Sequence, residues 1–235
     1  MKRTTRMSVI IAAAGAGRRM GGASKPFMRL GRGTVLSFSL RTFASLRETR
    51  EIIVVVNPRD IEAARGSLAT VRKRYKISNI VEGGPLRQDS VARGLECVSP
   101  DANIIAVHDA ARPFAAPALV RRVMAAAMRS GAAIPAAPVK DTLKRTAGNN
   151  RVMETVAREN LWHVQTPQIF NAGLLRRAYR KHAHRGEFTD DASLVERMGR
   201  AVIVVESDHS NLKITTPQDL ALARLLVPGR KRKPR

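Results

Sequence analysis

Short apolar runs and amphipathic stretches alternate along the chain between residues 8 and 139. Runs rich in Val, Ile and Ala predict buried strands, because a strand covered on both faces is apolar at nearly every position. Stretches with apolar residues every three or four positions predict helices between them. The predicted strands are 8–14, 51–56, 77–82, 103–107 and 132–139, and the predicted helices are 34–47, 59–74, 88–98 and 117–130.

This alternation of strands and helices predicts an α/β protein with an open, mostly parallel sheet and helices on both faces. Ligands of such sheets bind at the carboxyl ends of the strands. Three of the predicted ends are 15–17, 83–84 and 109–112, where glycine, charge and proline concentrate. The pattern and the chemistry therefore indicate the same edge of the sheet.

The alternation breaks between residues 140 and 170. Two strand-like stretches, 141–145 and 152–156, flank a turn at 148–150 and predict a long hairpin. A lone hairpin is marginally stable in water, so it needs a surface to lie on. The simplest such surface is a second subunit, so we expect a homodimer that exchanges its arms.

The helical pattern returns after the hairpin. We predict helices over 172–181 and 190–198, a last strand over 201–205, and a closing helix over 217–226 that begins with Pro217 after Thr216. No internal repeat marks a second domain. We therefore expect a single domain over 1–228, with an arm at about 140–162. Residues 229–235 form a basic stretch, which we interpret as a disordered tail or a cut linker.

The chain is strongly basic, with a formal net charge of +23 at pH 7. Part of this charge lies at the two ends, and the remainder still favours anionic partners. Only 4% of the residues are aromatic, and the sequence has no helix-turn-helix, zinc-finger or RNA-recognition signature. We expect a solvated cationic surface and no nucleic-acid partner, and unspecific nucleic-acid binding is the alternative from another functional class.

The N-terminus imitates a secretory signal, because basic residues precede an apolar run. The run ends at glycines, meets Arg18 and Arg19, and supplies a strand that the fold needs, so we interpret it as retained. No apolar run approaches the ~20 residues of a membrane span. The single cysteine, Cys97, excludes an internal disulfide and a cysteine metal cluster. We expect a soluble, cytoplasmic protein without a membrane partner.

The first strand runs into a loop that is suited to a polyphosphate. Residues 8–20 read SVIIAAAGAGRRM, and Lys25 follows. Glycine lets the backbone turn sharply and brings its amides close to an anion. No acidic residue occurs before Glu48. The alternative interpretation is a glycine-rich turn between a core strand and a helix, with solvated arginines.

Two familiar phosphate loops do not match. A Walker A loop needs lysine after glycine and before serine or threonine, whereas Lys25 follows Ser24 and precedes Pro26. A dinucleotide fingerprint needs a third small residue where Met20 stands, and the strand over 51–56 is followed by no ribose-binding carboxylate. What remains is a loop in which side-chain cations supplement the backbone amides.

Further candidate chemistry follows the strand over 103–107. Asp109 stands where a carboxylate beside a polyphosphate helps to hold magnesium, and the alternative is a pair with Arg112 that only shapes the turn. We interpret His108 as structural, because one histidine beside an aspartate lacks metal-ligand spacing. Four further polar residues stand on or beside the predicted hairpin or in a polar turn after a strand, where exposure to solvent would be enough to explain them: Thr142, Arg158, Thr166 and Lys213.

Taken in order, these segments resemble the 2-C-methyl-D-erythritol 4-phosphate cytidylyltransferases of the non-mevalonate isoprenoid pathway. The resemblance covers nearly the whole chain, from Val9 to about Leu222. Many nucleotidyltransferases share the glycine loop, whereas the ordered set of motifs is far more specific. The set comprises AAGAGRRM at 13–20 with Lys25, GGPLRQDSV at 83–91, VHDAARP at 107–113, PVKDTLK at 138–144, LWHVQTPQ at 161–168, TDDAS at 189–193 and NLKIT at 211–215.

The resemblance implies a Rossmann-like fold of the nucleotide-diphospho-sugar transferase type. It implies transfer of CMP from CTP to 2-C-methyl-D-erythritol 4-phosphate, a sugar-alcohol phosphate, in isoprenoid precursor biosynthesis. The products would be 4-diphosphocytidyl-2-C-methyl-D-erythritol and pyrophosphate, with magnesium as the cofactor. Such a step needs positioned cations and no covalent nucleophile, because the attacking phosphate oxygen is already ionised.

The resemblance also implies roles for individual residues. Arg19 and Lys25 would stabilise charge on the α-phosphate, while Lys213 and the Arg158 of the other subunit's arm would aim the second substrate. The residues expected to bind the nucleotide are Ala13, Ala14, Gly15, Gly17, Arg18, Gly84, Pro85, Ser90 and Ala110. The residues expected to bind the second substrate are Asp109, Arg112, Thr142 and Thr166, and Asp109 would also bind the metal.

The sequence departs from the family pattern at four positions. Ser24 and Pro26 flank Lys25 where relatives often have proline before the lysine and glutamine after it. Pro85 has no amide hydrogen, so any contact from it to a base must use its carbonyl. Ala157 replaces an acidic residue. Close relatives that act on ribitol 5-phosphate share most of the motifs, so a ribitol-5-phosphate cytidylyltransferase is the alternative enzyme.

Overall fold

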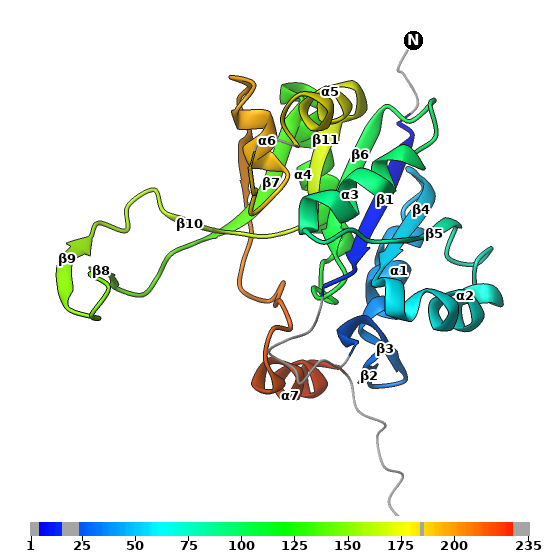
Figure 1. Ribbon diagram of the computed structural model, residues 1–235, viewed down its shortest axis with the longest axis horizontal. Helices are drawn as coiled ribbons and strands as arrows, with labels where there is room; N and C mark the ends of the chain where they lie inside the picture. The colour runs from blue at the N-terminus through cyan, green and yellow to red at the C-terminus, as the bar shows by residue number, and fades with distance from the viewer. Residues whose placement is uncertain (1–4, 16–23, 184–185, 228–235) are drawn as a thin grey trace, which may run out of the picture.

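The computed structural model describes residues 5–15, 24–183 and 186–227. Within these residues, eight strands form the central sheet, in the order β10-β7-β11-β6-β1-β4-β5 with β12 also paired to β7 (Figure 1). The strands are β1 (Met7–Ala13), β4 (Thr49–Val56), β5 (Ile77–Glu82), β6 (Ile104–Asp109), β7 (Ala132–Pro138), β10 (Trp162–Val164), β11 (Gln168–Asn171) and β12 (Ile203–Glu206). A small separate hairpin pairs β2 (Arg29–Leu30) with β3 (Gly33–Thr34).

The sheet is mostly parallel, as predicted. Strand β1 pairs in parallel with β4 and β6, β4 with β5, and β12 with β7. Strands β10 and β11 run antiparallel to their neighbours, and β11 lies between β6 and β7. The sequence pattern did not predict these two strands, because a segment of three or four residues is too short to show a hydrophobic period. Their strand conformation depends on the neighbouring strands that they join.

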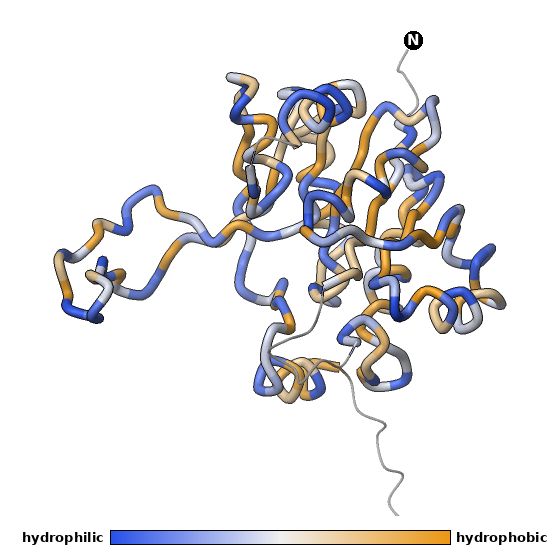
Figure 2. The backbone as a smooth tube through the Cα atoms, viewed as in Figure 1, coloured by the Kyte–Doolittle hydropathy of each residue, from blue (hydrophilic) through white to orange (hydrophobic). Residues whose placement is uncertain are grey.

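Helices cover both faces of the sheet, which confirms the predicted fold class. Helices α1 (Val35–Ala44), α2 (Ile61–Ala69) and α4 (Pro117–Ser130) pack on one face. Helices α3 (Arg87–Glu96), α5 (Ala172–His182) and α6 (Ala192–Glu196) pack on the other. Figure 2 shows apolar residues concentrated along the central strands between these layers. No helix in the described part of the chain is long and apolar enough to cross a membrane.

Capping residues fix the starts of two helices, each at or next to the first residue predicted for that helix. The Thr34 hydroxyl accepts a hydrogen bond from the Ser37 amide at the start of α1. Thr216 does the same at the start of α7 (Pro217–Leu226), with the amide of Asp219 as donor. Each cap satisfies an amide that has no partner within its helix.

The predicted helix over 59–74 is shorter in the structure. A 3-10 turn at Pro58–Asp60 precedes α2, and turns follow the helix after Ala69. Val71 and Tyr75 pack against the same apolar cluster as α2. The apolar spacing therefore continued past the helix because the turns also cover the core.

The predicted hairpin is present as an arm. Strand β8 (Leu143–Thr146) pairs antiparallel with β9 (Val152–Val156), and the arm projects away from the sheet in Figure 1. The chain leaves the sheet after β7 and returns at β10, which pairs with β7. Val152 and Met153 are 54% and 57% exposed on the arm. Use of the arm for dimerisation stays a prediction. The division into one domain and a tail also stays a prediction, and the tail over 229–235 lies outside the described residues.

Candidate active site

Two cavities adjoin at the carboxyl end of the sheet. The first has a volume of about 890 Å³ and lies at the ends of β1, β4, β5 and β6. The second has a volume of about 430 Å³ and lies beside β10 and β11. Three side chains line both cavities: Arg87, Asp109 and Lys213. These three residues mark the boundary at which contents of the two cavities would meet.

The first cavity gathers the predicted nucleotide residues that the structure describes. Its lining includes Ala13, Ala14, Gly15, Lys25, Gly84, Pro85, Ser90 and Ala110. Gly17, Arg18 and Arg19 lie outside the described residues. The residues lie at the ends of three different strands, β1, β5 and β6, or in the segments that follow them, so the predicted convergence at this edge is present. Their assignment to a nucleotide stays a prediction.

The connection between β4 and α2 holds the chain on both sides of the glycine loop. The side-chain amide of Asn57 donates from Nδ2 to the Ala14 carbonyl at 3.2 Å, just before the loop. The Ser24 hydroxyl donates to the Asp60 carboxylate at 2.7 Å, just after it. Lys25 follows at once, lines the first cavity, and donates to the Thr215 carbonyl at 3.5 Å. Ser24, a departure from the family pattern, thus has a contact of its own.

Close packing explains the glycines between β5 and α3. A Cβ atom on Gly83 would lie 2.3 Å from the Ala14 side chain, and one on Gly84 would lie 2.3 Å from the Asp89 side chain. The Gly84 amide also donates to the Ser90 hydroxyl at 3.1 Å. The turn therefore requires glycine for its own geometry, whether or not a base lies against it.

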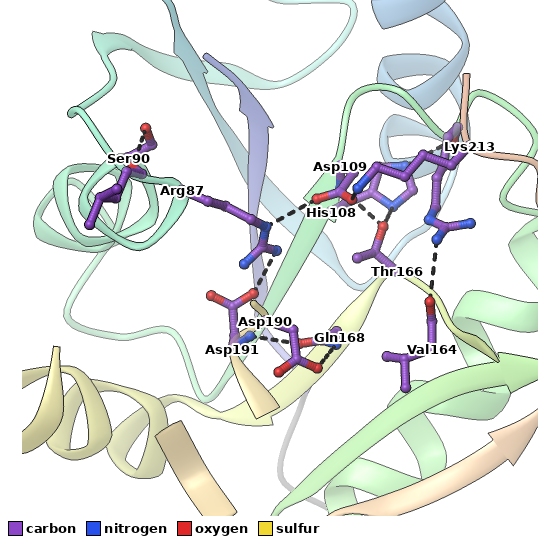
Figure 3. A network of polar contacts seen from close by, with 12 residues as sticks. Arg87, Ser90, His108, Asp109, Val164, Thr166, Gln168, Asp190, Asp191 and Lys213 are labelled. Carbon is purple, nitrogen blue, oxygen red and sulfur yellow. Dashed lines mark hydrogen bonds and ion pairs between the residues drawn. The ribbon is translucent and has the colours of Figure 1, made fainter. Parts of the chain in front are cut away.

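Asp109, the last residue of β6, is held between two cations. Its Oδ1 accepts a hydrogen bond from Arg87 at 3.4 Å, and its Oδ2 accepts one from Lys213 at 2.7 Å (Figure 3). Burial alone would raise the pKa of Asp109, but the two cations outweigh it and hold that pKa well below its usual range. Arg112 instead donates its side-chain hydrogen bonds to the carbonyls of Val164 and Asn211, at 3.3 and 2.7 Å.

Arg87 is the principal site residue that sequence reasoning did not single out. It also donates to Asp191 at 2.8 Å, and Asp191, fully buried, accepts a second hydrogen bond of 2.5 Å from the Tyr179 hydroxyl. Burial opposes the charge on Arg87, but Asp191 and Asp109 together raise its pKa above the ordinary value. The sequence did offer one indication, because Arg87 and Asp191 lie in two of the motifs shared with the family, at 83–91 and 189–193.

His108 is fully buried and lines neither cavity. This agrees with its interpretation as a structural residue. Its ring meets the edge of Phe43 at a centroid distance of 4.9 Å. Burial lowers the pKa of His108 to about 4, so the imidazole is neutral at pH 7. Its Nδ1 lies 3.1 Å from the Thr166 hydroxyl, and its Nε2 lies 3.1 Å from the Arg112 carbonyl. Thr166 and Arg112 both line the second cavity.

Two predicted site residues lie apart from both cavities of their own chain. Thr142 and Arg158 belong to the arm, are exposed, and do not line either cavity. The Arg158 guanidinium donates to the Lys140 carbonyl, also within the arm. A role for these two residues therefore requires the arm of a second copy, and it stays a prediction.

The described side chains could hold a magnesium ion only if a bound phosphate compound supplied further oxygen ligands. Among the described residues, no group of three or more His, Cys, Asp and Glu side chains could hold a metal ion. The two carboxylate oxygens of Asp109 accept hydrogen bonds from Arg87 and Lys213, and each has a further lone pair. Magnesium in nucleotide sites commonly takes one or two carboxylates and completes its shell with phosphates and water. Asp109 fits such a shared site.

Comparisons with known proteins agree with this geometry. The sequence profile of the 2-C-methyl-D-erythritol 4-phosphate cytidylyltransferase family matches residues 7–228. A protein of that name from Alkaliphilus oremlandii is 39% identical over 98% of this chain and 99% of its own. One from Symbiobacterium thermophilum is 44% identical over 94% of this chain and 92% of its own.

A crystal structure of a protein with that name has the same fold as this chain. The 2-C-methyl-D-erythritol 4-phosphate cytidylyltransferase from Thermus thermophilus superimposes with a TM-score of 0.77 at 40% sequence identity. The match covers 94% of this chain and 98% of the other. The chain therefore belongs to the 2-C-methyl-D-erythritol 4-phosphate cytidylyltransferase family of nucleotidyltransferases.

Proposed function

We propose that this chain transfers CMP from CTP to 2-C-methyl-D-erythritol 4-phosphate, in isoprenoid precursor biosynthesis. A phosphate oxygen of the sugar-alcohol phosphate forms a bond to the α-phosphorus of CTP. The bond between that phosphorus and the bridging oxygen to the β-phosphate breaks. Pyrophosphate leaves, and 4-diphosphocytidyl-2-C-methyl-D-erythritol is the product. Family membership supports the reaction class and both substrates.

One observation carries the proposal, namely the two cavities that share Arg87, Asp109 and Lys213. Transfer between two phosphorylated substrates requires separate pockets whose reacting ends meet. The first cavity is large enough for a nucleotide, and the smaller one suits a short polyol phosphate. The charged residues at their boundary stand where two anionic groups would approach each other.

Positioned cations are the main requirement of this step. Two phosphate groups repel each other, and negative charge builds on the leaving pyrophosphate oxygen as its bond to the α-phosphorus breaks. Lys25 from the nucleotide side and Lys213 from the boundary would offset this repulsion, together with Arg19. Asp109 would hold a magnesium ion jointly with the triphosphate, and this ion would neutralise phosphate charge.

We place the enzyme in the cytoplasm, in keeping with its single cysteine.

We further propose a homodimer in which each arm completes the site of its partner. The arm projects from the body and exposes Val152 and Met153, which suits burial against another surface (Figure 1). Arg158 and Thr142 lie on the arm and outside their own cavities. A second copy is the simplest partner, because exchanged arms would bring both residues to a site in a closed, symmetric assembly.

Pyrophosphate release tests the proposed reaction. The purified enzyme with CTP and magnesium should release pyrophosphate with 2-C-methyl-D-erythritol 4-phosphate and much less with ribitol 5-phosphate. Release with ribitol 5-phosphate alone would transfer the assignment to that substrate. Release with neither would contradict both assignments.

Replacement of Arg158 by alanine should raise the KM for the sugar phosphate more than the KM for CTP. The loss of one charged hydrogen-bond partner of a phosphate corresponds to roughly tenfold to hundredfold in affinity. Steady-state kinetics with each substrate varied in turn would measure the split. Arg151→Ala, on the exposed turn of the same arm, is the matched control. Equal effects on both KM values would contradict the role of the arm.

A subunit-mixing experiment tests whether Arg158 acts across the dimer. An Arg158→Ala subunit retains Lys213, and a Lys213→Ala subunit retains Arg158. If the arms are exchanged, each mixed dimer contains one complete site, so reassorting the two impaired proteins should restore activity at a low concentration of the sugar-alcohol phosphate. If Arg158 acts within its own chain, both sites of the mixed dimer are incomplete and no activity returns.

A further inference from the structure

The Thr166 hydroxyl stands between a donor and an imidazole ring. Its Oγ1 accepts a hydrogen bond of 3.0 Å from the backbone amide of Asp109. The same atom lies 3.1 Å from Nδ1 of His108 (Figure 3). Thr166 is 5% exposed, and it lines the second cavity. The direction of the bond between Thr166 and His108 therefore decides what the hydroxyl offers to a ligand.

The other ring nitrogen of His108 fixes that direction. Nε2 lies 3.1 Å from the backbone carbonyl of Arg112, a group with lone pairs and no hydrogen. If Nε2 had no hydrogen, two lone pairs would face each other in a fully buried place, at a cost comparable to a lost hydrogen bond. The hydrogen-bond partners of the ring, two hydroxyls and this carbonyl, are all uncharged, so a charged imidazolium would have no counter-charge bonded to it in this buried place. The ring is therefore neutral, and Nε2 carries its hydrogen. Ser39, whose hydroxyl lies 3.4 Å from Nε2, is compatible with this tautomer.

With the hydrogen on Nε2, Nδ1 of His108 can only accept. The Thr166 hydroxyl must then donate its single hydrogen to Nδ1, while its oxygen accepts from the Asp109 amide. One lone pair of Oγ1 remains, and no hydrogen. Towards the second cavity, Thr166 is thus an acceptor only.

We propose that His108 is a positioning residue that makes Thr166 a selective acceptor for a hydroxyl group of the second substrate, rather than a contact to its phosphate. This inference rests on the proposed function, because it takes the second substrate to be a polyol phosphate. A phosphate monoester in its dianionic form presents only acceptor oxygens, so it cannot pair with an acceptor. The phosphate is left to the cations at the boundary, and Thr166 recognises the polyol part.

The imidazole tautomer can be tested without any substrate. Long-range ¹H–¹⁵N NMR spectra of the ¹⁵N-histidine-labelled enzyme distinguish the two neutral tautomers of each ring. We expect His108 to carry its hydrogen on Nε2, with Nδ1 unprotonated. Its signals are those missing from the His108→Gln variant, or are assigned through the backbone if that variant does not fold. A hydrogen on Nδ1 would overturn the proposal, even if the enzyme has the proposed activity.

Deoxy analogues of the sugar-alcohol phosphate, each lacking one hydroxyl, test the recognition. Thr166→Val should weaken competitive binding of the parent compound by about threefold to tenfold, as expected for one lost neutral hydrogen bond. The same replacement should not weaken binding of the one analogue that lacks the hydroxyl facing Thr166. Thr166→Ser should restore the wild-type pattern. An equal loss for every analogue would indicate a merely structural role and would overturn the proposal.

These two experiments separate failure of this inference from failure of the proposed function. The proposed function fails if no pyrophosphate is released with the parent sugar phosphate. The tautomer assignment depends only on the free enzyme. An active enzyme whose Thr166→Val variant weakens all analogues alike would retain the proposed function and lose this inference.

Discussion

Lys25→Ala should lower turnover by about a hundredfold or more while leaving the fold intact. Removal of one preorganised charge at a developing anion typically costs about 10² to 10³ in kcat. Lys25 lines the first cavity and starts a 3-10 turn held by the bond between Ser24 and Asp60. Its ammonium group donates to the Thr215 carbonyl at 3.5 Å, so it is already held at the cavity before a substrate arrives. Turnover measured by pyrophosphate release at saturating concentrations of both substrates would test this.

The control for this variant is Lys73→Ala, which removes the same charge from an exposed turn outside both cavities. It should retain nearly full turnover, and Lys25→Arg should fall between the two. The melting temperature of Lys25→Ala should stay close to that of the wild type. Near-normal turnover of Lys25→Ala would mean that the α-phosphate does not lie beside this residue.

Much of the fold was predictable because its elements are determined locally. The β4 strand is a β-branched run at the centre of the sheet, and its residues from Ile53 to Val56 are all fully buried. Thr34 and Thr216 cap their helices with bonds that depend only on the next few residues. The antiparallel strand β11 was not predictable in this way, because its four residues become a strand by filling the space between β6 and β7.

The candidate site was predictable only in part, for a related reason. Strand ends carry Gly15, Gly84 and Asp109 to one edge, and strand ends can be located from the sequence. The pairing of Arg87 with Asp191 joins residues 104 positions apart, and no local pattern indicates it. The direction of the Thr166 hydroxyl likewise depends on a ring and a carbonyl brought together by folding.

Arg87→Ala should destabilise the protein by about 3–5 kcal/mol, because it leaves a buried carboxylate without its cation. The fully buried Asp191 side chain bonds to Arg87 and to the Tyr179 hydroxyl, and it would keep only the hydroxyl. Asp109 would lose the same cation and keep Lys213. For a domain of this size, the melting temperature should fall by roughly 6 to 20 °C. Thermal unfolding followed by circular dichroism would measure the shift.

The exposed pair of Arg65 with Glu62 provides the matched control. Its side chains are 56% and 81% exposed, so Arg65→Ala should cost less than about 1 kcal/mol. A double variant, Arg87→Met with Asp191→Leu, removes both charges and should recover part of the stability lost in Arg87→Ala. A melting temperature of Arg87→Ala no lower than that of Arg65→Ala would show that Asp191 does not need this cation. A double variant less stable than Arg87→Ala would attribute the loss to packing, because the carboxylate would then be absent and the destabilisation would persist.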